Sequence, residues 1–395
     1  MQGESIIYVA KEWDEVPTSC NHVFEHLAKN NKVLWVNSIG TRNPNLASAR
    51  DWSRILRKAK KLLGGIKQVA PQGWVYQPVF LPLPHSRLAQ RINRWLLRYL
   101  LRRQARKLGM KNPQLWMFIP NGAFLVHQLD ESLVVYYCTD DWAGFAHLDG
   151  GKVARLERQL LEEADLCLAA SESLLELKRK VNPNTFLSLH GVDYERFAQA
   201  LDPNLPIPAD IAGLPRPAIG FFGGMRSHID FPAIEQIAKS HPEWSVVLIG
   251  KVEQEIEKDA ERLRSYSNVH ILGQRPYESL PAYCRGFDAG IIPYRCNEFI
   301  GHVNPIKLRQ YLSAGLPVVS TDFPEVRRFK ELVYLGNTPA EFVACLEQAL
   351  REDSPARRRE RSEAMRAETW EAKVEEIGAR VMQAKQNRAR TAPRH

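Results

Sequence analysis

Strand-like and helix-like segments alternate along almost the whole chain. Short apolar runs rich in β-branched and aromatic residues are separated by runs with helical periodicity. In the first half these strand-like runs lie at 6–10, 32–37, 74–80, 114–120, 133–139, 166–171 and 185–190. In the second half they lie at 218–224, 245–250, 269–273, 289–294, 317–321 and 332–336. Because such alternation is typical of parallel sheets covered by helices on both faces, the sequence predicts an α/β fold.

A proline-rich stretch, residues 201–217, interrupts the alternation and indicates a domain boundary. At 395 residues the chain is also too long for one ordinary core. We therefore predict two doubly wound, Rossmann-like domains, 1–203 and 204–368, with a long amphipathic helix and a basic tail over 369–395. Because ligands of doubly wound sheets bind beyond the carboxyl ends of the strands, we expect the two domains to face each other across a cleft.

The charge is concentrated in one part of the chain. The formal net charge is +9, and the segment 41–112 holds seventeen Lys or Arg residues against one acid, Asp51. Two stretches in it, 51–67 and 87–109, have the pattern of basic amphipathic helices, the second with Leu88, Ile92, Trp95, Leu96 and Leu100 on its apolar face. Such helices suit an anionic membrane surface, although a solvated helix face explains them equally well. Nucleic acid is a third alternative, without a recognition motif to support it.

The apolar runs and the cysteines indicate where the protein works. No apolar run approaches the length of a membrane span, and the first residues lack a secretory-signal pattern. The six cysteines are scattered without C-x-x-C pairs, which is typical of reduced thiols. We expect a cytoplasmic protein that can also lie peripherally on the inner face of the membrane.

The segment 301–321, GHVNPIKLRQYLSAGLPVVST, predicts a short helix with a lysine in an unusual place. Asn304 suits the N-cap, Pro305 the first helical position and Gly315 the position after the helix, so we expect a helix over 305–314. Lys307 then lies in the first turn, where the helix dipole disfavours a cation. A diphosphate bound at the helix N-terminus would make this placement favourable. The alternative is an ordinary surface lysine.

Two glycines follow the strand-like run that begins the second half. Gly223 and Gly224 would let the backbone approach a ligand, and Arg226 after them could pair with a phosphate. A simple tight turn is the alternative. Because the pattern is not G-x-G-x-x-G, it does not support a dinucleotide cofactor.

An acidic pair follows the strand-like run 133–139. Asp140 and Asp141 would lie at a carboxyl edge, where a carboxylate could act as a general base on a hydroxyl or orient it. Alternatively, one of them caps the next turn; we expect at least one to be functional. His190, near the predicted hinge, is a weaker catalytic candidate, because a lone histidine beside a strand end is more often structural.

These segments together resemble GT-B glycosyltransferases of the glycosyl transferases group 1 type. KLRQYLSAGLPVV (307–319) is similar to the family pattern Lys-Leu-x-Glu-Tyr-x-x-x-Gly-x-Pro-Val-Val. LHGVDYERF (189–197) resembles the segment that ends the family's N-terminal domain. VVYYCTDDWAGF (134–145) is similar to a subgroup that builds bacterial cell-surface polysaccharides such as teichuronic acid. The resemblance covers roughly residues 5–385, and 301–326 is its most specific part.

The resemblance implies a transferase that moves a sugar from a nucleotide-diphosphate donor to a saccharide or polyprenyl-linked acceptor. The donor would be a substrate rather than a cofactor, and no metal is expected. The C-terminal domain would bind the donor through Gly223, Gly224, Arg226, Arg275, Tyr277, His302, Asn304, Ile306, Lys307 and Gln310. The aspartate pair 140–141 would serve the acceptor, with retention of anomeric configuration expected although related enzymes with an aspartate base invert it.

Two positions depart from the family pattern. Gln310 stands where the family usually has a glutamate that accepts hydrogen bonds from ribose hydroxyls, and His302 replaces an earlier glutamate. A neutral glutamine still accepts a hydrogen bond through its carbonyl, but without charge assistance. These departures leave open a catalytically silent GT-B protein that binds a saccharide or a partner. The basic segment leaves open, more weakly, a nucleic-acid binder.

Overall fold

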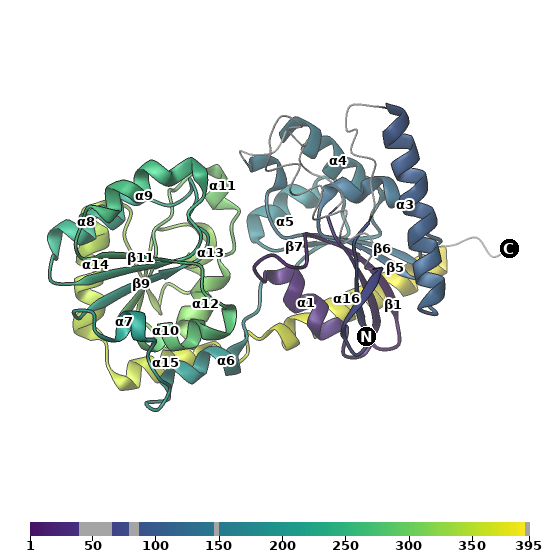
Figure 1. Cartoon of the computed structure of the whole chain (residues 1–395). Helices are drawn as coiled ribbons and strands as arrows, with labels where there is room; N and C mark the ends of the chain where they lie inside the picture. The colour runs from purple at the N-terminus through teal and green to yellow at the C-terminus, as the bar shows by residue number, and fades with distance from the viewer. Residues whose placement is uncertain (39–64, 79–86, 146–149, 392–395) are drawn as a thin grey trace. The chain divides into compact units, whose positions relative to one another are not determined.

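The computed structural model describes residues 1–38, 65–78, 87–145 and 150–391, which form two compact units (Figure 1). Unit 1 comprises Met1–Leu189 together with Lys373–His395, and unit 2 comprises His190–Ala372. Each unit is a parallel sheet with helices, so the predicted α/β class is confirmed. Most of the first predicted basic helix, within 51–67, lies outside the described residues.

Unit 1 is built on an eight-stranded sheet in the order β3-β4-β2-β1-β5-β6-β7-β8. The strands are β1 Ser5–Val9, β2 Lys32–Val36, β3 Ile66–Ala70, β4 Gly73–Tyr76, β5 Gln114–Met117, β6 Leu133–Cys138, β7 Leu166–Ala169 and β8 Thr185–Leu187. The strands pair in parallel except for β3 with β4, an edge hairpin that the sequence did not predict. The central strands β5 and β6 are buried along their whole length, which explains their continuous apolar runs.

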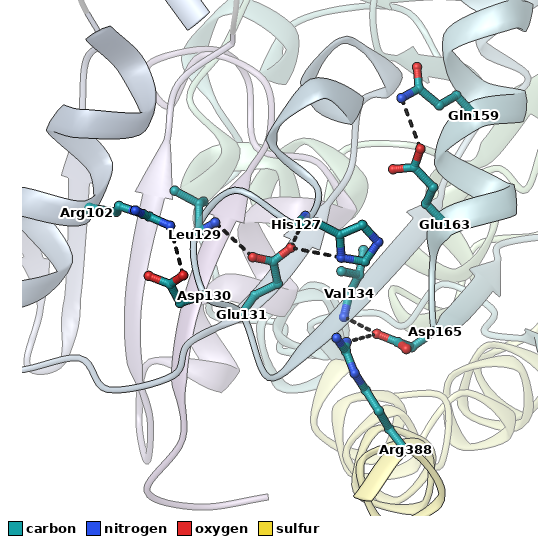
Figure 2. A network of polar contacts seen from close by, with 10 residues as sticks. All are labelled: Arg102, His127, Leu129, Asp130, Glu131, Val134, Gln159, Glu163, Asp165 and Arg388. Atoms are coloured by element: carbon teal, nitrogen blue, oxygen red, sulfur yellow. Dashed lines mark hydrogen bonds and ion pairs between the residues drawn. The ribbon is translucent and has the colours of Figure 1, made fainter. Parts of the chain in front are cut away.

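Long helices cover the sheet of unit 1. They are α1 Ser19–Leu27, α3 Arg87–Lys107, α4 Gly150–Glu163, α5 Glu172–Arg179 and α16 Trp370–Thr391, with 3₁₀ turns η2 Pro120–Leu125 and η3 Trp142–Gly144. The predicted C-terminal helix therefore forms, and from Lys373 onward it belongs to unit 1. Figure 2 shows how it is held: Arg388 pairs with Asp165, whose carboxylate also accepts the Val134 N–H at 2.7 Å. Lys385 donates to Glu4 at 2.7 Å.

Unit 2 is built on a six-stranded parallel sheet in the order β11-β10-β9-β12-β13-β14. Its strands are β9 Ala218–Phe222, β10 Ser245–Ile249, β11 Val269–Gly273, β12 Ala289–Ile292, β13 Val318–Ser320 and β14 Val333–Leu335. Its helices are α6 Tyr194–Ala198, α7 Ala209–Ala212, α8 Phe231–Ser240, α9 Glu257–Arg264, α10 Leu280–Arg285, α11 Glu298–Gly301, α12 Ile306–Ser313, α13 Pro324–Arg327, α14 Pro339–Glu352 and α15 Pro355–Ala364. The strand order reverses between β9 and β12, which is the topological switch point where such sheets bind ligands.

The boundary between the units differs from the predicted one at 203/204. It falls between Leu189 and His190, ahead of the proline-rich stretch. The reason is packing: the Phe197 ring lies 6.3 Å from Phe222 and is buried in the core of unit 2. Ile211, inside the proline-rich stretch, is buried in the same core. The prolines therefore mark an irregular part of unit 2 and not a linker.

Candidate functional site

Two loops approach each other closely beside the switch point of unit 2, after β9 and β10. Gly223 follows β9 with φ +139°, and Gly250 follows β10 with φ +149°, a region that side chains disfavour. A Cβ atom on Gly250 would lie 1.9 Å from the carbonyl oxygen of Gly223. A Cβ atom on Gly223 would lie 3.0 Å from Nζ of Lys307. Glycine at both positions therefore lets the strand ends and the lysine ammonium meet, and a ligand contact by Gly223 stays a prediction.

Lys307 lies in the first turn of α12, and neutral groups surround its half-buried ammonium. Nζ donates a hydrogen bond to the hydroxyl of Tyr294, which follows β12. The same atom lies 4.9 Å from the ring centroid of Tyr294 and 4.9 Å from that of Phe221. Aromatic faces stabilise a cation without neutralising it. The Lys307 charge is thus held in place and remains able to attract an anion.

The start of α12 differs from the prediction in one respect. Pro305 is the N-cap residue, without a side-chain capping bond, and the helix begins at Ile306. Asn304, predicted as the N-cap, instead accepts a hydrogen bond from Nη1 of Arg309 at 2.8 Å. The reason is that the Arg309 side chain is only 1% exposed and takes the amide oxygen as a partner inside the core. The predicted C-terminal glycine is confirmed, since Gly315 has φ +77° and its N–H bonds the Leu312 carbonyl at 2.8 Å.

The next turn of α12 is fixed against β9. The hydroxyl of Tyr311 accepts the backbone N–H of Phe222 at 3.0 Å, which ties the helix to the end of that strand. Gln310 is buried and shares a helix face with Lys307, three residues earlier. Lys307 and Gln310, two of the three predicted donor-binding residues of α12, therefore lie on one face of a helix that Tyr311 ties to β9.

Two polar side chains that the sequence analysis missed complete the cluster. Tyr294 closes the strand-like run 289–294, so its place at a carboxyl end was the signal that could have found it. The His228 ring packs edge-on against Tyr294 with 4.8 Å between centroids. Burial, and then the positive charges of Lys307 and Arg226, lower the pKa of His228 to about 3. The imidazole is therefore neutral near pH 7 and adds no third charge.

Arg226 supplies the second cation at this edge. Its guanidinium is 45% exposed and lies 3.9 Å from a carboxylate oxygen of Glu253, a loose pair that leaves it accessible. Arg226 and His228 come from the loop after β9, Tyr294 from the loop after β12 and Lys307 from α12, and the fold brings these four residues together. The resulting cluster is cationic and open to solvent on the Arg226 side.

Other predicted donor contacts have partners of their own within unit 2. Arg275 pairs with Asp210 at 2.8 Å, donates to the Tyr283 hydroxyl at 2.8 Å and bonds the Leu272 carbonyl. The Tyr277 ring packs edge-on against Phe197 with 5.8 Å between centroids. Their described contacts thus support local packing, and a nucleobase contact by this loop stays a prediction. His302 is half-buried in the turn between α11 and α12.

The acidic pair follows β6 of unit 1, as predicted. Asp140 is half-buried and accepts a hydrogen bond from the Thr139 hydroxyl at 3.2 Å. Asp141 occupies the N-cap position of η3 but makes no side-chain capping bond, so the capping alternative does not account for its carboxylate. Burial lowers the pKa of Lys178, but Cys138, Glu157 and, least of these, Asp141 raise it, so that it lies above its ordinary value.

A buried ion pair lies next to the acidic pair. Nζ of Lys178 is 2.9 Å from Oε1 of Glu157, and the Tyr136 hydroxyl donates to the same oxygen at 2.7 Å. Burial, with Cys138 and Glu157 nearby, raises the pKa of Tyr136 well above its ordinary value. These buried contacts hold the end of β6 in place. The raised pKa keeps the Tyr136 hydroxyl protonated, so it donates a hydrogen bond to Glu157.

The third catalytic candidate, His190, is packed as a core residue. It is buried and its ring lies 5.8 Å from that of Trp370. A Cβ atom on the next residue, Gly191, would lie 2.6 Å from the backbone nitrogen of Trp370. This close packing favours the structural alternative for His190.

Among residues 1–38, 65–78, 87–145 and 150–391, no three His, Cys, Asp or Glu side chains lie close enough to hold a metal ion. None of the helices described there combines the length and the apolar character that a membrane span requires.

Residues 216–352 match the model of the family described as glycosyl transferases group 1. TuaH of Bacillus subtilis (strain 168), which its name assigns to teichuronic acid biosynthesis as a glycosyltransferase, is 27% identical over 252 residues. That alignment covers 60% of this chain and 63% of TuaH. The predicted resemblance to the group 1 type is therefore confirmed, with its match in the unit that carries Lys307.

Solved structures show the same fold over nearly the whole chain. A sucrose-phosphate synthase from Thermosynechococcus elongatus aligns with a TM-score of 0.70 at 16% identity, covering 97% of this chain and 100% of that one. Anabaena HepE in complex with UDP and glucose aligns with a TM-score of 0.61 at 13% identity, covering 98% and 99%. The predicted GT-B fold is thereby confirmed.

Proposed function

We propose that this protein is a glycosyltransferase that moves a sugar from a nucleotide-diphosphate donor to a saccharide or lipid-linked acceptor in surface polysaccharide synthesis. The observation that carries the proposal is the placement of Lys307. Its ammonium lies at the start of α12 and beside Gly223, within residues 216–352, the part of the chain that matches the family. The name of TuaH supports the polysaccharide pathway, and HepE, solved with UDP and glucose, supports the donor class.

Transfer of the sugar requires positive charge beside the departing diphosphate, and the cluster around Lys307 would supply it. When the bond from sugar to diphosphate breaks, negative charge develops on the leaving group and positive charge on the sugar. Lys307, Arg226 and the N–H groups of the first turn of α12 would stabilise that negative charge without a divalent metal. Donor binding by Gly223, Gly224, Asn304 and Ile306 is part of this proposal. Gln310 and His302 would face the nucleoside, and the loop with Arg275 and Tyr277 its base.

The acceptor side of the proposal rests on the acidic pair. Asp140 or Asp141 would accept a proton from the attacking hydroxyl or orient it. Both residues directly follow β6, a strand that is buried along its whole length. Retention of anomeric configuration, expected from the resemblance, remains part of the proposal. So does a location on the cytoplasmic side at an anionic membrane surface.

The first test is a screen of nucleoside diphosphates and nucleotide sugars. Isothermal titration of the full chain with UDP, GDP and ADP is expected to show saturable binding of at least one of them. Slow hydrolysis of the corresponding nucleotide sugar, detected as release of the diphosphate, would then identify the donor. Absence of binding by every nucleoside diphosphate would refute the proposal.

The departure at Gln310 favours a second candidate, a catalytically silent protein that binds a saccharide or a partner. This candidate shares the fold but loses the charge-assisted hydrogen bond to the ribose. The same titration separates the two, because the silent protein is expected to bind oligosaccharides and no nucleoside diphosphate.

A further inference from the structure

Helix α3 of unit 1 has two apolar faces. Its inner face, Leu97, Leu101 and Ala105, is buried in the core. Its outer stripe consists of Leu88, Ile92, Trp95 and Tyr99, exposed by 68, 41, 58 and 47% respectively. At about 100° per residue, the outer stripe is centred about 150° around the helix axis from the inner face. Of the apolar residues singled out in the sequence, Leu88, Ile92 and Trp95 belong to the outer stripe, and Leu96 and Leu100 lie half-buried at its flank.

The outer stripe is unusual for this protein. Among the residues that the structure describes, the remaining exposed large hydrophobic side chains are Val16 and Leu177, which lie outside α3. The rings of Trp95 and Tyr99 stack at 5.8 Å with only 6° between their planes, so they form one continuous apolar ridge. Contiguous exposed apolar surface of this kind marks an interaction surface. Figure 1 shows α3 running along one side of unit 1.

The charges around the outer stripe have one sign. Every charged residue in α3, RLAQRINRWLLRYLLRRQARK, is Arg or Lys. Arg91, Arg94 and Arg103 are exposed. Arg102 pairs with Asp130 at 2.8 Å, an acid from the loop before β6 (Figure 2). The apolar ridge is thus bordered by cations supplied by its own helix.

A cleft of about 320 Å³ opens beside the outer stripe, between α3 and η2. It is lined by Arg94, Trp95, Arg98, Phe124, Leu125 and Gln128. The Arg94 guanidinium lies 5.3 Å from the Phe124 ring centroid, and Arg98 donates to Gln128 at 3.1 Å. Guanidinium groups over apolar walls suit a phosphate that carries an apolar chain.

We propose that the outer stripe and its flanking arginines dock unit 1 on an anionic lipid bilayer, with the cleft receiving a phosphate-bearing headgroup. The stripe would enter the boundary between headgroups and acyl chains, and the arginines would meet the lipid phosphates. Charge complementarity selects this occupant, because a second copy would bring arginine against arginine. Nucleic acid would leave the aliphatic part of the stripe in water. The inference rests on the proposed function, of which it specifies the membrane location and the lipid-linked acceptor, and vesicle binding tests it without any sugar donor.

Co-sedimentation with vesicles of phosphatidylcholine, with or without phosphatidylglycerol, tests the stripe in the full chain. We expect the wild type to bind only the anionic vesicles. The variant L88Q/I92Q/W95Q/Y99Q is expected to bind them at least tenfold more weakly, whereas the matched control V16Q/L177Q binds as the wild type does. Unchanged far-UV circular dichroism would show that the outward substitutions leave the fold intact. Equal binding of the wild type to both kinds of vesicle, binding to neither, or full binding by the stripe variant would overturn the proposal.

A second pair of variants separates the local arginines from net charge. R91Q/R94Q/R98Q and the control R351Q/R357Q/R359Q, in α14 and α15, remove the same charge. Only the first is expected to weaken binding, by about tenfold or more. Brominated lipids quench the fluorescence of tryptophans that enter the bilayer. Although the wild type has nine tryptophans, W95F alone should lose most of this quenching. Vesicle binding that free glycerol phosphate abolishes and that the stripe substitutions leave unchanged would reveal a headgroup site without docking, and a dimer abolished by the stripe variant would reveal a second copy. Either result would overturn the proposal.

Discussion

Replacing Lys307 with alanine removes the cation that the proposed mechanism places against the donor diphosphate. In the free protein the ammonium contacts a hydroxyl and two aromatic faces at 4.9 Å, and Arg226 contributes a second positive charge nearby. Such contacts stabilise a cation only weakly, so we expect Lys307→Ala to change the free energy of unfolding by no more than about 2 kcal/mol. The loss should therefore appear in ligand binding and not in folding.

The size of the binding defect follows from the kind of bond that is lost. A hydrogen bond to a charged group contributes about 1.5–3 kcal/mol, which corresponds to roughly a 10- to 150-fold weaker Kd for the nucleoside diphosphate. Charge grows on the leaving group during transfer, so kcat is expected to fall as well, by about 100-fold or more. Isothermal titration and steady-state kinetics with the donor identified by the screen measure the two effects separately.

A matched variant excludes a general charge effect. Lys330→Ala removes the same charge from a side chain that is 70% exposed and pairs with Glu331 instead of the switch-point cluster. It is expected to bind and turn over the donor as the wild type does. If both Lys307→Ala and Lys330→Ala bind the donor within twofold of the wild-type affinity, the assignment of Lys307 to the diphosphate is wrong.

Three further substitutions test the surrounding geometry. The pKa of His228 is lowered from 6.5 to about 3 in the folded protein, so between these pH values only the unfolded chain binds a proton. The free energy of unfolding is therefore unaffected by this group above pH 6.5 and falls as the pH drops toward 3. His228→Asn should remove up to about 1.4 kcal/mol per pH unit from the slope of unfolding free energy in that window, measured by urea unfolding, and an unchanged slope would contradict the shift. Gly250→Ala puts a Cβ atom 1.9 Å from the carbonyl oxygen of Gly223 and should lower the free energy of unfolding by about 3 kcal/mol or more. Gly301→Ala, the control, adds a Cβ atom in open space and should not lower it, so equal melting temperatures of the two variants would refute the close approach of Gly250 to Gly223. Gln310→Glu restores the carboxylate of the family pattern and should tighten nucleoside diphosphate binding by about 1 kcal/mol if the ribose lies there, with Gln386→Glu at an exposed position of α16 as the control; weaker or unchanged binding would remove Gln310 from the donor site.

The sequence could predict the parts of the fold that depend on local pattern. Buried parallel strands read as continuous apolar runs, so β5, β6, β9 and β10 were found close to their true bounds. Strand β3 was missed because Lys67 and Gln68 in it are exposed and its apolar content is small. The N-cap prediction at Asn304 failed because the partner that takes its amide, Arg309, is a charged side chain buried in the core, which local propensity does not reveal.

The candidate site could be predicted only in part, because its members meet through topology. Lys307 stood out since its position in a helix conflicts with the helix dipole. His228 and Tyr294 carry no such local conflict, and they come together only when the sheet places the ends of β9 and β12 side by side. Tyr311 likewise reaches Phe222 across 89 positions of sequence. Contacts of that separation follow from strand order, which a single sequence does not specify.

The electrostatics of the switch point explain why the cluster suits a dianion better than a single carboxylate. Arg226 is only loosely balanced by Glu253 at 3.9 Å, and Lys307 is surrounded by neutral groups, so two positive charges remain largely uncompensated at one edge. A protonated His228 would add a third charge and repel both, but burial keeps its imidazole neutral. The positive-φ glycines let the backbone reach this edge without side chains that would fill it. An anion with one charge would leave one cation unpaired, whereas a diphosphate offers several oxygens to both and to the helix N–H groups. Two cations and the helix N–H groups at one edge are therefore what the proposed diphosphate site requires.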